Sequence, residues 1–228
     1  MGERYGYRNA QVTCLAPTGT IGLLMDCATT GVEPDFALVK FKKLAGGGYF
    51  RIANEAAPLA LKNLNYTQEQ IKDILIYLKG TADISNAPHI NQKSLKEKGF
   101  NDDDLININK ILPGAFEIRF VFNVWTLGED CMRRVGFSSA QYSDHDFNML
   151  RALGFTDEQI DAANEYVCGT MTIEGAPHLK PEHYPVFDTA NRNGKKGKRF
   201  IPYMGHVKMM AAVQPILSGA ISKPINMS

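Results

Sequence analysis

Residues 11–22 read Gln11-Val12-Thr13-Cys14-Leu15-Ala16-Pro17-Thr18-Gly19-Thr20-Ile21-Gly22. The first five residues are strand-like, and the apolar run from Ile21 to Met25 is long enough to begin a helix. The start of that helix would face the Thr18-Gly19-Thr20 turn, where backbone N–H groups and two hydroxyls suit an anion such as phosphate. The stretch therefore indicates either a phosphate site or an ordinary strand–turn–helix connection.

The composition is that of an ordinary soluble globular protein, with 228 residues, 44% hydrophobic residues and a net charge of +1. This length allows one large domain or two modest ones. Near-neutral charge gives no reason to expect a nucleic-acid or membrane partner. The four cysteines are scattered without a C-x-x-C pair, and no signal peptide or membrane-spanning run is present. We therefore expect a cytoplasmic protein with reduced thiols.

The chain divides into three zones by sequence pattern. Residues 1–52 contain strand-like runs at Gln11–Leu15 and Phe36–Phe41, and a glycine turn at 46–48 leads into a third run at 49–52. Residues 53–199 are mostly helical in pattern. Residues 200–228 return to a mixed pattern, with a helix at His206–Leu217 and a short strand within 218–226.

An internal repeat occupies the helical zone. Residues 64–89 and 153–178 align without a gap, and 12 of these 26 positions are identical. Residues 95–105 look like a third, degenerate copy of the first half of the unit. Such a duplication favours a scaffolding or docking role, and a direct ligand site is the alternative.

Each full copy carries the signals of a capped helix. Thr67 and Thr156 are expected N-caps, each with a glutamine three residues later as in a capping box. Gly80 and Gly169 stand where a left-handed C-terminal cap belongs. The Ala-Pro-His that follows each glycine stops the helix. Each unit is therefore expected to be a helix, a stop and an extended tail.

Other groups offer weaker candidates for chemistry. His89 and His178 occupy matching repeat positions, but the histidine spacing fits no standard zinc pattern, so we expect no metal site. The aromatic run from Phe120 to Trp125 is expected in the core, and the basic run from Lys195 to Arg199 is expected to be a solvated loop. No nucleophile elbow, zinc-protease motif or Walker loop is present.

Longer runs of residues resemble one enzyme family, the adenosylcobalamin-dependent (class II) ribonucleotide reductases. The matching runs are Ala-Pro-Thr-Gly-Thr-Ile-Gly at 16–22, Thr-Gly-Val-Glu-Pro-Asp at 30–35, Lys-Lys-Leu-Ala-Gly-Gly-Gly-Tyr-Phe at 42–50, Glu-Gly-Ala-Pro-His-Leu-Lys at 174–180, His-Val-Lys-Met-Met-Ala-Ala at 206–212 and Gln-Pro-Ile-Leu-Ser-Gly-Ala-Ile-Ser-Lys-Pro-Ile-Asn at 214–226. The resemblance extends over essentially the whole chain.

The resemblance implies an α/β fold, in which segments 1–52 and 200–228 belong to a ten-stranded barrel and 53–199 is a mainly helical insertion. It implies conversion of ribonucleotides to 2′-deoxyribonucleotides by radical chemistry, with adenosylcobalamin as cofactor. In this family the Ala-Pro-Thr-Gly-Thr loop, here at residues 16–20, holds the substrate phosphates. Carried over by residue, the phosphate site comprises Ala16, Pro17, Thr18, Gly19, Thr20 and Ile21.

The departures from the family pattern limit what this chain is expected to do. The family's radical cysteine lies in an Asn-x-Cys-x-Glu motif, and none of the four cysteines has those neighbours. We therefore expect no catalytic residue in this chain, which would be inactive alone and would need a complementary reductase chain. The alternatives are a noncatalytic helical module that docks protein or nucleic acid, and a non-functional remnant.

Overall fold

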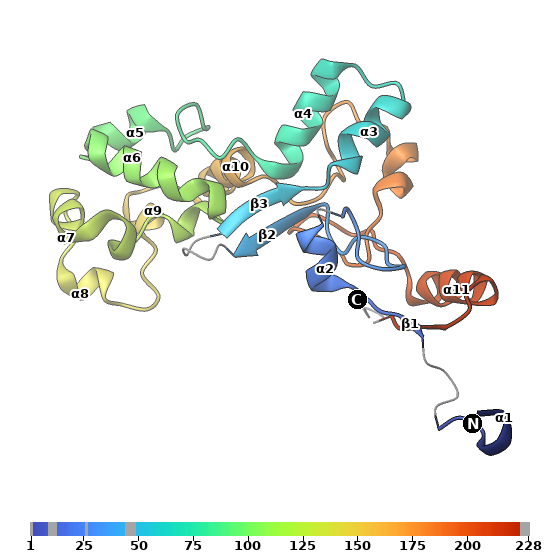
Figure 1. Ribbon diagram of the computed structural model, residues 1–228. Coiled ribbons are helices and arrows are strands. Elements are labelled where there is room, and N and C mark those ends of the chain that lie inside the picture. The colour runs from blue at the N-terminus through green and yellow to red at the C-terminus, as the bar shows by residue number, and fades with distance from the viewer. Residues whose placement is uncertain (1, 9–12, 26, 44–48, 224–228) are drawn as a thin grey trace.

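The computed structural model describes residues 2–8, 13–25, 27–43 and 49–223 (Figure 1). Helices dominate these residues, and the strands form two small sheets. The elements are α1 Gly2–Tyr5, β1 Cys14–Leu15, α2 Gly19–Leu24, β2 Val39–Lys43, β3 Tyr49–Ala53, α3 Ala56–Asn63, α4 Gln68–Lys79, α5 Gln92–Glu97, α6 Asp102–Ile111, η1 Leu112–Gly114, η2 Ile118–Phe120, α7 Val124–Arg134, α8 Ser139–Tyr142, α9 Met149–Ala152, α10 Asp157–Cys168, η3 Pro181–Phe187, α11 Tyr203–Val213, η4 Gln214–Ile216 and β4 Ala220–Ile221.

The first sheet joins segments from opposite ends of the sequence. Strand β1 pairs with β4 in parallel, with Cys14 opposite Ala220. The second sheet is the antiparallel hairpin β2–β3, in which Phe41 lies opposite Arg51. Within the described residues these strands form two separate two-stranded sheets and close no barrel. The mixed helix-and-strand character is therefore present, whereas the described residues do not form a ten-stranded barrel.

The predicted strands and the last helix are present with shifted ends. The first strand covers only Cys14–Leu15 of the expected run, and residues 11–12 lie outside the described residues, as does the glycine turn at 46–48. Strand β2 begins at Val39 rather than Phe36, because its partner strand ends at Ala53, directly opposite Val39. Helix α11 begins three residues before the expected His206 and gives way to η4 at Gln214.

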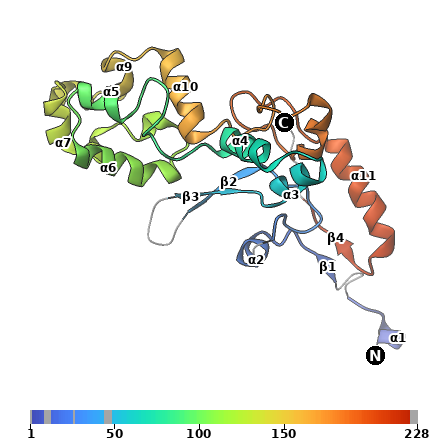
Figure 2. The ribbon, with the colours of Figure 1, turned by 90° about the horizontal axis from the view of Figure 1, so that it is seen from above.

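Two hydrophobic clusters stabilise the fold. One is built from residues 84–168 and includes the fully buried Ile108, Met132 and Leu150. The other joins Leu38 and the face of α4 to Ile173 and Phe187. Figure 2 shows helices α5–α10 gathered at one end of the molecule, with α11 and the β1–β4 pair at the other. The β2–β3 hairpin lies between these two groups.

The predicted N-caps of the repeat are confirmed in both copies, and a glycine ends each helix as expected, but not in the left-handed helical conformation. Thr67 and Thr156 each cap a helix through a complete capping box with Gln70 and Gln159. Gly80 and Gly169 end these helices at φ values of 74° and 78°. Both have ψ near 172°, a backbone region that is essentially restricted to glycine.

The two copies pack against each other with approximate twofold symmetry. The N–H of Thr81 donates to the carbonyl of Tyr166, and the N–H of Thr170 donates to the carbonyl of Tyr77. These bonds are related by the repeat offset, because residue 77 matches 166 and residue 81 matches 170. The next residues repeat the exchange, from Ala82 to Val167 and from Met171 to Leu78. The duplication is therefore one body with two halves, not two separate units.

One short turn recurs before four helices. Each example has a residue with positive φ, then a buried aromatic ring, then a residue that caps the next helix with a capping box. The examples are Asn65-Tyr66-Thr67, Gly99-Phe100-Asn101, Gly136-Phe137-Ser138 and Gly154-Phe155-Thr156. The turn at Gly136-Phe137-Ser138 belongs to none of the repeat copies that were identified from the sequence, although the sequence there has the same order of glycine, aromatic residue and cap.

None of the helices among the described residues is long and apolar enough to cross a membrane.

Candidate functional site

The predicted phosphate loop lies between β1 and α2, beside the strand that the last part of the chain supplies. The N–H of Ala220 donates to the carbonyl of Thr13 at 3.1 Å, and the N–H of Ser222 donates to that of Leu15 at 3.0 Å. These two bonds fix the chain immediately before Ala16. The loop thus follows a strand, as the sequence pattern predicted, and the structure adds that this strand pairs in parallel with β4.

The six predicted site residues lie together and face outward. Gly19, Thr20 and Ile21 form the exposed first turn of α2, Pro17 and Thr18 are half-buried, and Ala16 is exposed. No described residue accepts a hydrogen bond from the N–H groups of Gly19, Thr20 or Ile21. The first N–H groups of a helix have no partner within it, so these three are available to an anion.

Thr18 holds the turn in a strained conformation. Its φ is 53°, in the left-handed region that β-branched residues rarely adopt. Its carbonyl accepts from the N–H of Gly22 at 2.7 Å, so the strain accompanies the entry into α2. A Cβ added to Gly19 would meet nothing within 4 Å, so the space above the turn is open. Strain of this kind is concentrated at binding sites.

The segment after α2 supports the loop from behind, which sequence reasoning did not identify. Gly31 adopts a φ of 58°, and a Cβ there would approach the carbonyl oxygen of Ala16 to 2.9 Å. Further along, Lys40 pairs with Asp35 at 2.7 Å and donates to the carbonyl of Ala28 at 3.0 Å. The segment is therefore held between the loop and strand β2. Only glycine fits at position 31, where the segment contacts Ala16.

Comparison with known proteins identifies the family of the chain. The family model of the ribonucleotide reductase barrel domain matches residues 1–98 and 132–228. The chain belongs to the ribonucleotide reductase barrel-domain family. It is 58% identical over its full length to the vitamin B12-dependent ribonucleotide reductase of Bradyrhizobium diazoefficiens and 57% identical to that of Agrobacterium fabrum. It is 37% identical to that of Streptantibioticus cattleyicolor. The chain spans about a fifth of the length of these relatives, between 18% and 22%.

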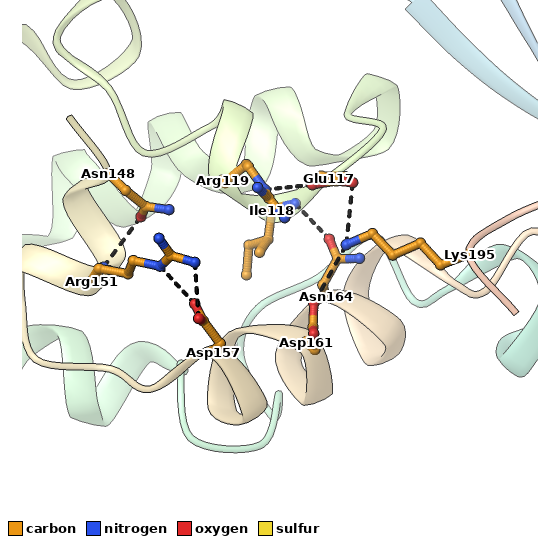
Figure 3. A network of polar contacts seen from close by, with 9 residues as sticks. All are labelled: Glu117, Ile118, Arg119, Asn148, Arg151, Asp157, Asp161, Asn164 and Lys195. Carbon is orange, nitrogen blue, oxygen red and sulfur yellow. Dashed lines mark hydrogen bonds and ion pairs between the residues drawn. The ribbon is translucent and has the colours of Figure 1, made fainter. Parts of the chain in front are cut away.

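The basic run of this reductase-family chain is engaged in internal ion pairs. Lys195 lies 3.4 Å from Glu117 and 3.5 Å from Asp161, as Figure 3 shows, and Lys196 lies 2.5 Å from Glu165. Arg199 makes a two-pronged contact with Asp188 at 2.7 Å. Lys195 and Lys196 therefore attach the run to α10, and Lys195, Lys196 and Arg199 are each paired with a carboxylate.

The two histidines of the repeat are turn residues. His89 and His178 have φ values of 62° and 65°, each just before a buried aliphatic residue. The Nε2 of His178 contacts Asp73 at 3.0 Å. Among the described residues, no three histidine, cysteine, aspartate or glutamate side chains are placed to hold a metal ion.

The four thiols fall into two classes, which predicts their reactivity. Cys14 and Cys27 are exposed, whereas Cys131 and Cys168 are buried. Burial raises the pKa of Cys131 to about 12 and that of Cys168 to about 11, so neither forms a thiolate near neutral pH. We expect a thiol reagent at about pH 8 to label two cysteines in the native chain and four after denaturation, counted by mass spectrometry.

The same shifts predict a loss of stability in alkali. The folded state keeps the protons of Cys131 and Cys168 above pH 9, where unfolded thiols lose theirs. The unfolding free energy is therefore expected to fall as pH rises from 9 toward 11, measured by urea unfolding. Labelling of Cys131 or Cys168 in the native chain would contradict the burial on which both expectations depend.

Proposed function

We propose that this chain is the part of a vitamin B12-dependent ribonucleotide reductase that holds the phosphates of the ribonucleotide substrate. The observation that carries the proposal is the set of three N–H groups at Gly19, Thr20 and Ile21, which have no hydrogen-bond acceptor among the described residues and lie at the exposed start of α2. The names of the relatives support the same reading, since each is a reductase of ribonucleotides.

The loop would act by binding and orientation. The three N–H groups donate to phosphate oxygens, and the hydroxyl groups of Thr18 and Thr20 add donors from either side of Gly19. The open space at Gly19 lets a phosphate approach the backbone closely. Ala16 and Pro17 shape the wall of the pocket. We take a ribonucleoside diphosphate as the proposed substrate, in a cytoplasmic enzyme.

The proposed architecture places the two strand-bearing ends of the chain in the catalytic barrel. The parallel pairing of β1 with β4 supports this, because it brings segments 1–52 and 200–228 into one sheet across the 53–199 insertion. The remaining strands of a ten-stranded barrel would come from the rest of the reductase, in one polypeptide or in a complementary chain. That part would also bring the Asn-x-Cys-x-Glu motif, which these 228 residues do not contain.

The residues of this chain do not by themselves fit adenosylcobalamin. The cofactor needs a large cavity beside a reactive thiol, because the family's chemistry passes through a cysteine. The cleft of about 440 Å³ around Asn164 and that of about 840 Å³ around Trp125 have no cysteine in their linings. Cys131 and Cys168 are buried, protonated thiols. We therefore assign the cofactor to the complete enzyme.

Replacing both hydroxyls should weaken nucleotide binding. In the Thr18→Ala/Thr20→Ala double variant, we expect affinity for a ribonucleoside diphosphate to fall about tenfold or more, because two donors to charged oxygens are lost. Isothermal titration calorimetry on the 228-residue chain measures this, with Thr29→Ala as the matched control outside the loop. Equal binding by wild type and double variant would exclude the two hydroxyls as phosphate ligands.

Turnover by the chain alone is expected to be absent. Mixed with ribonucleotide, adenosylcobalamin and a dithiol, the purified chain should form no deoxyribonucleotide, because no radical-cysteine motif is present. Chromatography of the nucleotide products measures this. Deoxyribonucleotide formed without any second chain would refute the assignment of the radical cysteine to another part of the reductase.

The rival function is a noncatalytic docking module. For nucleic acid, it would need an unpaired basic surface, whereas Lys195, Lys196 and Arg199 each pair with a carboxylate. Nucleic-acid binding with a steep salt dependence, together with no binding of ribonucleotide, would favour the module over the proposal.

A further inference from the structure

A cleft lies far along the chain from the phosphate loop, between the first half of α7 and the segment that runs from the end of α8 to Phe147. Its volume is about 840 Å³, within the range of ligand-binding clefts. The residues that line it are Phe122, Asn123, Val124, Trp125, Gly128 and Glu129 on one side and Tyr142, Ser143, Asp144, His145 and Phe147 on the other.

The floor and walls of this cleft present aromatic surface to solvent. Trp125 is the single tryptophan of the chain and is 89% exposed. This overturns the expectation that the run from Phe120 to Trp125 is core, because only Val121 and Phe122 within it are buried. Tyr142 and Phe147 are partly buried against the neighbouring hydrophobic cluster. An exposed tryptophan beside other rings is typical of an interaction site, where it provides most of the apolar contact.

The backbone of α7 keeps this surface open. Gly128 interrupts the helix with φ 78° and ψ 162°, a conformation restricted to glycine. A Cβ at Gly128 would meet nothing within 4 Å, so the glycine is needed for its backbone conformation and not for lack of space. The kink separates the turn that carries Trp125 from the rest of α7.

The rim of the cleft is acidic. Glu129 and Asp144 line it, and no described residue forms an ion pair with either. Asp130 follows Glu129 directly and Asp146 lies two residues after Asp144, with side chains 91% and 97% exposed. Arg133 pairs with Asp130 at 2.6 Å, and the Nδ1 of His145 lies 3.4 Å from Asp146. The rim therefore keeps a surplus of negative charge around aromatic surface.

An exposed tryptophan surrounded by carboxylates indicates a positively charged partner. A cation over an indole face is attracted by the ring, and tryptophan is the best of the aromatic residues for this contact. Carboxylates beside the ring add a second attraction for the same cation and repel nucleic acid. We propose that the cleft around Trp125 binds a basic protein segment, with an arginine or lysine side chain over the indole and against Glu129 and Asp144.

One side of the cleft also stands apart from the shared reductase fold. The family model leaves residues 99–131 unmatched, and these include Phe122, Trp125 and Glu129. The Bradyrhizobium diazoefficiens protein nevertheless aligns over all 228 residues. The side of the docking surface that α7 supplies up to Glu129 is thus carried by a segment outside the general barrel-domain pattern, whereas the side from Tyr142 to Phe147 lies within the matched residues.

The single tryptophan makes the test specific to the site. The 228-residue chain would be titrated with an acetylated, amidated peptide in which arginine alternates with glycine and leucine, while tryptophan emission is recorded. A second peptide carries citrulline in place of arginine, which keeps the shape and removes the charge. We expect a saturable change in emission with the arginine peptide and binding about tenfold weaker with the citrulline peptide.

Charge variants complete the test. Glu129→Gln/Asp144→Asn should weaken binding of the arginine peptide about tenfold, whereas Glu55→Gln/Glu69→Gln removes two exposed carboxylates elsewhere and should leave it unchanged. Thermal unfolding checks that every variant is folded. No emission change, or equal affinity for the two peptides, would overturn the proposal. A chain that self-associates through Trp125 and is not displaced by the arginine peptide would also overturn it, in favour of a second copy as occupant.

Discussion

Replacing Gly80 or Gly169 by alanine is expected to unfold a large part of the helical insertion. A Cβ on Gly80 would lie 2.3 Å from the carbonyl oxygen of Val167, and one on Gly169 would lie 2.5 Å from that of Leu78. Both clashes are with backbone of the opposite repeat copy, which cannot move without breaking the hydrogen bonds between the copies. The backbone conformation adds strain, so each substitution should cost about 3 kcal/mol or more.

The matched control for these variants is Gly136→Ala. Gly136 also has positive φ, at 93°, but a Cβ there would meet nothing within 4 Å. It should therefore cost about 1 kcal/mol, from the left-handed conformation alone. Urea unfolding followed by circular dichroism compares the three variants. If Gly80→Ala were no more destabilising than Gly136→Ala, the two copies would not be in the close contact described.

The second large effect is expected at Arg51, which sits where the hairpin meets the insertion. Its guanidinium donates to the carbonyls of Lys79 and Cys168, at the ends of α4 and α10. It also donates to the carbonyls of Leu112 and Ala115, at 3.2 and 2.8 Å. A cation is favoured at the C-terminal end of a helix, and here one cation serves two helices related by the repeat. Burial lowers the pKa of Arg51, but the group remains charged.

Removing the guanidinium leaves several half-buried carbonyls without a donor. Arg51→Ala is therefore expected to destabilise the chain by about 4 kcal/mol, and Arg51→Lys by about half as much, because lysine keeps the charge but not the planar fork. Arg133→Ala is the control, since Arg133 is exposed and pairs with Asp130, and it should change stability by less than about 0.5 kcal/mol. Equal stabilities of the Arg51→Ala and Arg133→Ala variants in urea would show that Arg51 does not hold the two copies.

Local features of the fold were predictable from sequence, and long-range ones were not. The capping roles of Thr67 and Gly80 could be predicted, because a helix cap depends on residues within one turn of it. The reciprocal bonds between Tyr77 and Thr170 join residues far apart, and nothing in a single copy specifies them. Arg51 is a single charged residue in a strand-like run, so its contacts with the ends of two helices could not be predicted from the sequence.

In the candidate site, too, local features could be predicted from the sequence and long-range ones could not. The order of strand, turn and helix at residues 14–24 follows from composition and from the turn residues. The left-handed conformation of Thr18 does not, because threonine disfavours it and the surrounding structure imposes it. The support from Gly31 was equally hidden, since its contact with Ala16 depends on how the chain returns after α2. Exposure of Trp125 opposes its hydrophobic character, which is why the sequence placed it in the core.

The central claim is that residues 16–21 hold the phosphates of a ribonucleotide. The most direct measurement follows the backbone amide resonances of the chain by two-dimensional NMR while a ribonucleoside diphosphate is added. We predict that the resonances of Gly19, Thr20 and Ile21 shift with the diphosphate, and not with the same ribonucleoside lacking phosphates. Resonances that shift elsewhere while those three stay fixed would contradict the claim.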